Sequence, residues 1–256
     1  PSMDDQTDDW SRMQIAFRLG HHFENVSCSL SLLQKLGDIL REGEWKVTAV
    51  VDLANVIQSG ESNYPIRLID LQPGHIDEYS PLWSVAIDIG TTTVSLWLVD
   101  LVTGQVRAQV AEYNGQIARG EDVISRIIYA GKDGGTNDLR QRVLDTINTL
   151  LDTACKRVKA MPEDVVKVTI AGNSTMMHLL LGIPAGSIRL SPFITAVNHL
   201  PLMTAREVGM KANPEASVDC LPGVASYVGA DITAGVLSSG VDVAEDVTLF
   251  LDVGTN

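Results

Sequence analysis

The sequence predicts an α/β protein, in which a small α/β unit precedes a mixed sheet covered by helices. Two observations predict this fold. Segments with strand-like and helix-like hydrophobic spacing alternate along the 256 residues, and one motif closes two of the strands. Residues 88–93 read Asp-Ile-Gly-Thr-Thr-Thr, and residues 252–256 read Asp-Val-Gly-Thr-Asn. With 45% hydrophobic residues, the chain can form a packed core.

Residues 1–80 form the first predicted unit, a small α/β domain. Apolar residues at helical spacing alternate there with runs of β-branched and aromatic residues. The predicted elements are helices over 8–19 and 30–40 and strands over 45–51 and 66–71. Turn residues at 72–75 and the Tyr-Ser-Pro sequence at 79–81 mark the end of this unit.

Residues 81–256 form the second predicted unit, where the order of elements is more specific. Strand-like alternation over 94–100 and a Thr-Gly turn at 103–104 predict a meander of three antiparallel strands. The predicted elements are strands over 85–88, 94–100 and 105–113, helices over 121–129 and 137–158, a strand over 165–171, helices over 175–181 and 231–237, and a last strand over 247–252. An irregular, proline-containing stretch separates the helix over 175–181 from the helix over 231–237. This order indicates a mixed sheet with helices on it.

The motif at 88–93 has the chemistry of a phosphate and magnesium site. An Asp at the end of a buried strand is costly unless it faces a cation or hydrogen-bond donors. A following Gly lets the backbone approach an anion, and hydroxyl and N–H groups then form a concave anion site. We therefore expect Asp88 to hold Mg²⁺, mostly through water. We expect Gly90, Thr91 and Thr92 to bind phosphate. The alternative is a simple hairpin with a Gly turn.

The second copy of the motif argues against the alternative of a simple hairpin, because both copies have the same order of residue types. It predicts the same chemistry from the opposite side of a nucleotide. Asp252 would be a second magnesium ligand, and Gly254 and Thr255 would donate to phosphate.

Composition excludes several other classes of protein. A net charge of -13 and a pI near 4.7 argue against binding to nucleic acid or to an anionic membrane, which requires a basic face. The cysteines at 28, 155 and 220 form no pair or cluster that predicts a disulfide framework or a zinc site. No stretch approaches the ~20 apolar residues of a membrane helix, and no signal peptide is recognisable. We expect a cytoplasmic protein.

The element order and the Asp-Ile-Gly-Thr-Thr motif together resemble the superfamily of actin, sugar kinases and chaperone ATPases. The resemblance implies a ribonuclease H-like ATPase lobe over residues 81–256, in a protein whose two related lobes close over ATP. It adds Asp231 to Asp88 as a catalytic residue, with Asp231 orienting the attacking water; a helix cap is the alternative. Asn173 and Ser174 would contact nucleotide, or would cap the helix that follows.

Further segments narrow the resemblance to one family. These segments are 88–93, 114–116, 120–127, 172–182, 229–235 and 251–256. As a set they resemble the reductive activators of corrinoid proteins, and residues 1–9 are similar to the start of that family's middle region. The likeness spans essentially the whole chain.

This second resemblance implies an ATPase coupled to electron transfer. Members of the family use ATP to return an inactivated cobalt(II) corrinoid to the methyl-accepting cobalt(I) state. One electron comes from a 2Fe-2S cluster in an N-terminal domain. The implied cofactors are ATP and Mg²⁺, and the implied partner is a corrinoid iron–sulfur protein or corrinoid methyl carrier. A homodimer is left open.

Two departures from the family pattern limit what this chain does by itself. Cys28 stands alone within 1–80, so the spaced cysteines of a 2Fe-2S site are absent here. The chain also stops inside the second motif, before any adenosine pocket. We therefore expect a piece of a longer protein that is inactive when separated from the rest.

Three other functions remain open at the level of sequence. A sugar or carboxylate kinase of the same superfamily would need a catalytic Asp, and Asp231 is the candidate. An ATP-dependent activator of a dehydratase or reductase would bridge a cluster with cysteines of the ATPase lobe, a context that Cys155 and Cys220 lack. The third alternative is a non-enzymatic filament or scaffold.

Overall fold

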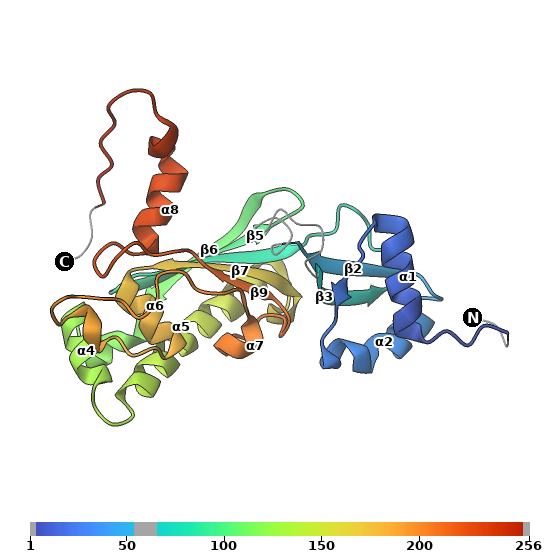
Figure 1. The fold of residues 1–256 in the computed structure, drawn as a ribbon, viewed down its shortest axis with the longest axis horizontal. Coiled ribbons are helices and arrows are strands. Elements are labelled where there is room, and N and C mark those ends of the chain that lie inside the picture. The colour runs from blue at the N-terminus through green and yellow to red at the C-terminus, as the bar shows by residue number, and fades with distance from the viewer. Residues whose placement is uncertain (1–3, 54–65, 253–256) are drawn as a thin grey trace. The chain divides into compact units, whose positions relative to one another are not determined.

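The computed structural model describes residues 4–53 and 66–252. The chain divides into two compact units, Pro1–Ser80 and Pro81–Asn256 (Figure 1). Both combine helices and strands, as the sequence predicted. Among the described residues, no helix combines the length and the apolar character that crossing a membrane requires.

The first unit packs two helices against a small sheet. Its elements are α1 (Asp9–His21), β1 (Val26–Ser27), α2 (Leu30–Glu42), β2 (Val47–Asp52) and β3 (Ile66–Pro73), with strand order β1-β3-β2. Each helix begins at a side-chain cap: Asp8 accepts a hydrogen bond from Ser11 N, and Ser29 accepts one from Leu32 N. The core of the unit includes Leu68, which is fully buried.

The second unit is built on a six-stranded sheet with the order β6-β5-β4-β7-β9-β8. Its strands are β4 (Trp83–Ile89), β5 (Thr93–Asp100), β6 (Gln105–Tyr113), β7 (Val165–Gly172), β8 (Met203–Thr204) and β9 (Ser217–Cys220). Strands β4, β5 and β6 form the predicted antiparallel meander. Strand β7 pairs in parallel with β4, and β9 pairs in parallel with β7. The predicted mixed sheet is therefore confirmed.

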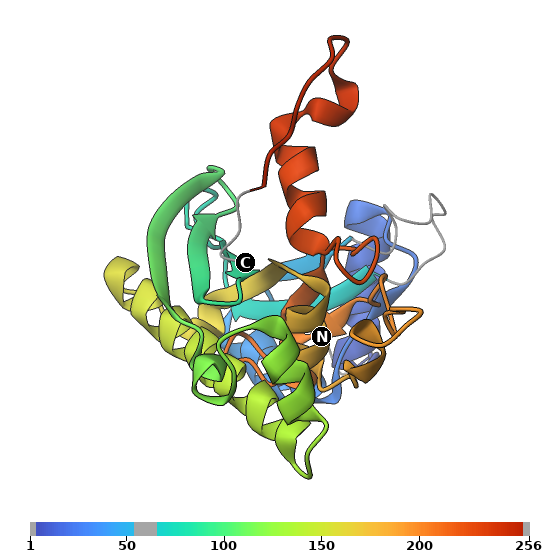
Figure 2. The same ribbon diagram turned by 90° about the vertical axis from the view of Figure 1, so that its left-hand side faces the viewer.

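The described residues of this unit form five α-helices: α4 (Val123–Ala130), α5 (Gly135–Val158), α6 (Ser174–Leu181), α7 (Ala205–Val208) and α8 (Ala230–Ser239). Short 3-10 turns lie at Gly115–Arg119, Pro162–Asp164, Gly186–Ile188 and Val241–Val243. Helix α5 buries the predicted apolar stripe, including Leu139, Val143 and Ile147, and contacts β5 and β6. Helices α4 and α5 lie on one side of the sheet, and α8 projects from the other (Figures 1 and 2).

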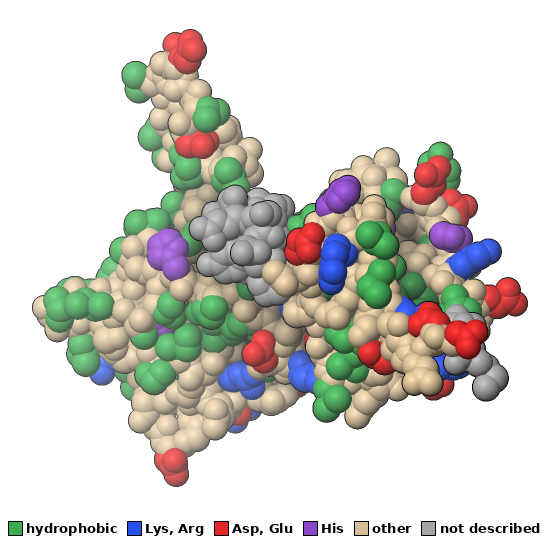
Figure 3. Space-filling view, turned by 45° about the vertical axis from the view of Figure 1, so that its right-hand side comes forward, with side chains coloured by type: hydrophobic (Ala, Val, Ile, Leu, Met, Phe, Trp, Pro, Cys, Tyr) green, Lys and Arg blue, Asp and Glu red, His purple; other side chains and the backbone are tan. Residues whose placement is uncertain are grey.

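The predicted strand over 247–252 is wrong in this structure. The segment forms no ladder, and Val247, Leu249 and Leu251 are largely exposed. A strand is stabilised by hydrogen bonds to a neighbour, and the described residues supply none for this segment. Hydrophobic side chains are accordingly exposed, together with acidic ones, on the projection formed by α8 and the residues after it (Figure 3).

Candidate functional site

Strand β4 delivers Asp88 to the end of the sheet. Val85, Ile87 and Ile89 alternate into the core with exposed fractions of 3% or less, so Asp88 emerges on the opposite face. The parallel register pairs Asp88 with Ala171 of β7. The carboxyl ends of both strands therefore meet at one edge of the sheet, where ligands commonly bind in α/β proteins.

A tight turn follows Asp88 and joins β4 to β5. Gly90 N donates to the carbonyl oxygen of Thr93 at 2.9 Å. A Cβ at Gly90 would lie 2.7 Å from that same oxygen, so the hairpin closes this tightly only around glycine. Thr91 and Thr92 occupy the turn and, with Gly90 and Thr93, line a cavity.

Side chains behind the hairpin hold the carbonyl groups of this turn. Asn114 donates from Nδ2 to Gly90 O at 2.9 Å and from its backbone N to Thr92 O at 2.8 Å. Arg126 donates from Nη2 to Thr91 O at 2.5 Å. Asn114 and Arg126 are both buried. Buried side chains of the protein interior therefore hold the turn in place.

The turn after β7 brings Asn173 to the same place. Asn173 Oδ1 accepts from Met176 N at 3.0 Å and caps α6, while its Nδ2 donates to Thr91 Oγ1 at 3.3 Å. The cap and the contact with the turn thus coexist in one side chain. Ser174 differs, because its Oγ donates to Ala225 O at 2.6 Å. Asn173 lines the cavity around Asp88, and Ser174 lines another one.

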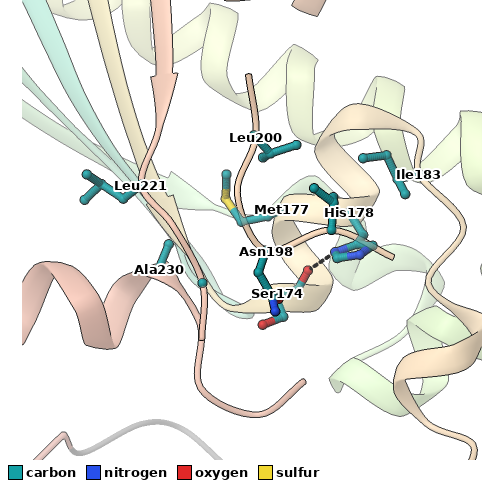
Figure 4. A pocket seen from close by; sticks show the side chains of 10 residues that line it. Ser174, Met177, His178, Ile183, Asn198, Leu200, Leu221 and Ala230 are labelled. Atoms are coloured by element: carbon teal, nitrogen blue, oxygen red, sulfur yellow. Dashed lines mark hydrogen bonds between the residues drawn. The ribbon is translucent and has the colours of Figure 1, made fainter. Parts of the chain in front are cut away.

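That other cavity is small and lies beneath α6 (Figure 4). Its volume is about 10 Å³, close to the space of a single water molecule. His178 Nδ1 lies 2.6 Å from Ser174 O, and His178 Nε2 accepts from Ala196 N at 3.1 Å. Burial lowers the pKa of His178, which favours the neutral ring. His178 is therefore a packed core residue.

Helix α8 contributes Asp231 from the far side of the cavity. Gly229, just before the helix, packs so closely that a Cβ there would lie 2.5 Å from Asn173 Cα. This close approach places the start of α8 against the turn after β7. Asp231 Oδ1 accepts from Ile232 N at 2.9 Å, so the carboxylate bonds to a backbone N–H of the first turn of α8 while it also lines the cavity.

The resulting Asp88 cavity has a volume of about 640 Å³ and is lined by the turn at 90–93, Asn173 and three carboxylates, those of Asp88, Asp231 and Asp252. Burial raises the pKa of Asp88, and the charges of Asp231 and Asp252 raise it further. Burial is also the largest cause of the raised pKa of Asp231. A bound cation would relieve this repulsion.

Magnesium fits this set of donors. Hard carboxylate oxygens suit the ion, which keeps several waters and needs only one or two carboxylates. The described residues contain no cluster of three or more His, Cys, Asp or Glu arranged as a metal cage.

The structure adds residues to the predicted site, and two of the predicted site residues lie outside the part of the chain that it describes. Thr175 and Tyr227 also line the Asp88 cavity but were not predicted. Thr175 follows Asn173 in the same motif, which is a usable signal, whereas nothing in the sequence distinguishes Tyr227. Gly254 and Thr255 lie outside the described residues.

Comparisons with known proteins agree on one family. A family model described as "RACo linker region" matches residues 1–78, and one described as "RACo middle region" matches residues 83–244. The name middle region thus attaches to residues 83–244, whereas the resemblance had likened residues 1–9 to the start of that region.

Two relatives are similar over much of this chain. The corrinoid activation enzyme RamQ of Eubacterium limosum is 33% identical over 203 residues, which are 79% of this chain and 33% of RamQ. A solved structure titled reductive activator for corrinoid, iron-sulfur protein superposes with a TM-score of 0.84 and 38% identity, over 100% of this chain and 39% of that one. This chain therefore spans about a third of the curated relative.

Proposed function

The chain belongs to the RACo family of reductive activators of corrinoid proteins, and on that premise we propose that it forms part of an ATP-driven activator. In this proposal, ATP binding and hydrolysis drive the one-electron reduction of a corrinoid protein from cobalt(II) to cobalt(I). The electron comes from a 2Fe-2S cluster in a domain outside this chain. The family and the names of both relatives support a corrinoid protein as partner.

The observation that carries the proposal is the Asp88 cavity. There the turn after β7 and the start of α8, which are far apart in sequence, meet the turn at 90–93. Asp88 and Asp252 would hold Mg²⁺ through water, and Gly90, Thr91 and Thr92 would donate to the phosphates of ATP. Mg²⁺ would neutralise phosphate charge at this point. Asp231 faces the same cavity and would orient the attacking water.

The sheet supports an ATPase lobe of the actin and chaperone type. Three antiparallel strands continue through the parallel strands β7 and β9, and this order supports the ribonuclease H-like lobe that we propose. Gly254 and Thr255, in the second motif, would approach the phosphates from the other side.

An uphill electron transfer explains why such an activator needs ATP. Each ~59 mV of unfavourable potential lowers the equilibrium constant of a one-electron step tenfold. ATP can offset this only if the two nucleotide states of the activator differ in their affinity for the cobalt protein. Closure of two lobes over ATP provides such a difference, and hydrolysis then releases the partner.

The test uses the full-length protein with Asp88→Asn. We expect ATP-stimulated corrinoid reduction, followed by the absorbance of the cobalt centre, to fall by at least ~10²-fold while the content of iron–sulfur cluster is unchanged. We also expect the nucleotide-free variant to be more stable at neutral pH, because it lacks a carboxylate whose pKa is raised by desolvation and by neighbouring charges.

The sign of the stability effect follows from proton linkage. A carboxyl with a raised pKa binds more protons in the folded state, so its charged form lowers stability as pH rises through that pKa. The advantage of Asp88→Asn should therefore shrink as the pH is lowered towards the range where Asp88 itself is protonated. Undiminished activity in the variant would remove Asp88 from the mechanism, and phosphoryl transfer to a sugar or carboxylic acid would favour the kinase alternative.

A further inference from the structure

Arg126 is a fully buried charged residue directly behind the turn at 90–93, for which we propose phosphate binding. Its exposed fraction is 0%. The guanidinium donates to Thr91 O at 2.5 Å, to Gly120 O at 2.8 Å and to Gln116 Oε1 at 3.2 Å. Within the residues that the structure describes, no carboxylate forms an ion pair with it. A buried cation that is bound only by neutral acceptors is costly, so its position calls for an explanation.

The pKa of Arg126 also reflects this cost of burying the charge. Burial lowers its pKa to about 10, and the charge of Asp122, at the start of α4, opposes that shift only in part. The side chain remains protonated near neutral pH. A full positive charge is therefore held in the interior, in contact with the backbone of the turn.

The peptide geometry shows what this contact does to the turn. In a trans peptide the C=O of one residue and the N–H of the next point in opposite directions. The carbonyls of Gly90 and Thr91 point inward, to Asn114 Nδ2 and Arg126 Nη2 respectively. The N–H groups of Thr91 and Thr92 must then point away from these donors, towards the side of the turn that lines the Asp88 cavity.

We propose that Arg126 is a positioning residue for the phosphate-binding turn. By holding Thr91 O from the interior, it directs the N–H groups of the turn into the Asp88 cavity. Its charge also offsets the negative potential of Asp88, Asp231 and Asp252, which would otherwise repel a triphosphate. The inference rests on the proposed function, in that it takes the phosphates of ATP as the ligand of this turn.

Arg140 provides a matched control in the same unit. It lies on α5 and also donates from its guanidinium to a carbonyl, that of Val208, at 2.7 Å. It does not line the Asp88 cavity. Arg140→Met therefore removes a comparable hydrogen bond and charge without touching the turn.

The experiment measures the affinity of the full-length protein for Mg-ATP and for adenosine. In Arg126→Met, we expect ATP affinity to fall by about tenfold or more, because charge-assisted contacts to phosphate are weakened. Adenosine affinity should stay within about twofold, since adenosine lacks the phosphates. Arg140→Met should change neither affinity. Equal losses for ATP and adenosine in Arg126→Met, or no loss in a folded variant, would overturn the proposal.

Arg126→Lys adds a readout that a purely structural residue would not move. A lysine buried among neutral acceptors loses its proton at a far lower pH than an arginine does. ATP affinity of this variant should therefore fall as the pH rises from about 6 to 9, while that of the wild type stays flat. Parallel pH profiles would contradict the role of the charge, also in the case that Arg126→Met fails to fold. Wild-type protein that binds no ATP would refute the proposed function itself.

Discussion

Gly229→Ala tests whether function requires the start of α8 to lie in close contact with the turn after β7. The backbone of Gly229 has φ -90°, which alanine adopts without strain, so the effect is one of space alone. The new Cβ would lie 2.5 Å from Asn173 Cα, 2.7 Å from Asp231 Oδ1 and 2.8 Å from Ser174 N. Ordinary contacts between such atoms are about 3.5–4.0 Å. The backbones must therefore separate by about 1 Å.

This separation should affect stability and activity to different extents. Overpacking of this size costs about 1–3 kcal/mol in the free energy of unfolding, while a 1 Å displacement of catalytic groups can lower a rate by ~10²-fold. The cavity places Asp231 on one side of the contact and Asn173 on the other. We expect ATP hydrolysis by full-length Gly229→Ala to fall by roughly two orders of magnitude.

The control is Gly186→Ala, because a Cβ at Gly186 would meet nothing within 4 Å. Urea unfolding gives the stability of each variant, and steady-state ATP hydrolysis gives its activity. Gly186→Ala should resemble the wild type in both. A Gly229→Ala protein as active as Gly186→Ala would refute the reasoning that the two elements must meet closely for function.

Two further substitutions separate structural from chemical roles. Asp231→Asn keeps an oxygen for Ile232 N but loses the charge, so ATP binding should persist while hydrolysis falls about 10²-fold or more; unchanged hydrolysis would leave Asp231 as a helix cap only. Asn173→Asp keeps a capping acceptor for α6 but cannot donate to Thr91 Oγ1. It should retain near-normal stability and lose ATP affinity, whereas Asn173→Ala should lose both, with about 0.5–2 kcal/mol of stability. Equal ATP affinity in Asn173→Asp and the wild type would contradict a role for Asn173 at the nucleotide.

The elements that sequence reasoning predicted well have periodic burial. Val94, Leu96 and Leu98 alternate with half-buried or exposed neighbours and are fully buried, so the period of two was visible before the structure. The apolar stripe of α5 is a similar signal at helical spacing. In both cases the local pattern and the final packing are consistent.

The elements that were missed depend on distant partners. Strand β9 has only four residues, two of them polar or acidic, and exists through its pairing with β7. The reverse applies to 247–252, whose strand-like pattern finds no neighbour among the described residues. Short strands are stabilised by pairing rather than by propensity, so a single sequence cannot decide them.

The site shows the same division between local and tertiary information. The motif at 88–93 indicated Asp88 and Thr91, and the resemblance to the ATPase superfamily added Asn173 and Asp231. The structure brings these four side chains to one cavity. Their chemical roles remain predictions. Arg126 lies inside a segment that carried the family resemblance, yet no local pattern shows that its charge is buried, because the fold alone determines which neighbours surround it.

The unpaired segment at 247–252 also affects how this chain behaves in solution. Val-Thr-Leu-Phe-Leu is short, apolar and rich in strand-forming residues, and such a run is prone to intermolecular pairing when it is exposed. Asp246 and Asp252 flank it as charged gatekeepers. Removing these two charges by substitution should therefore promote aggregation of the isolated chain.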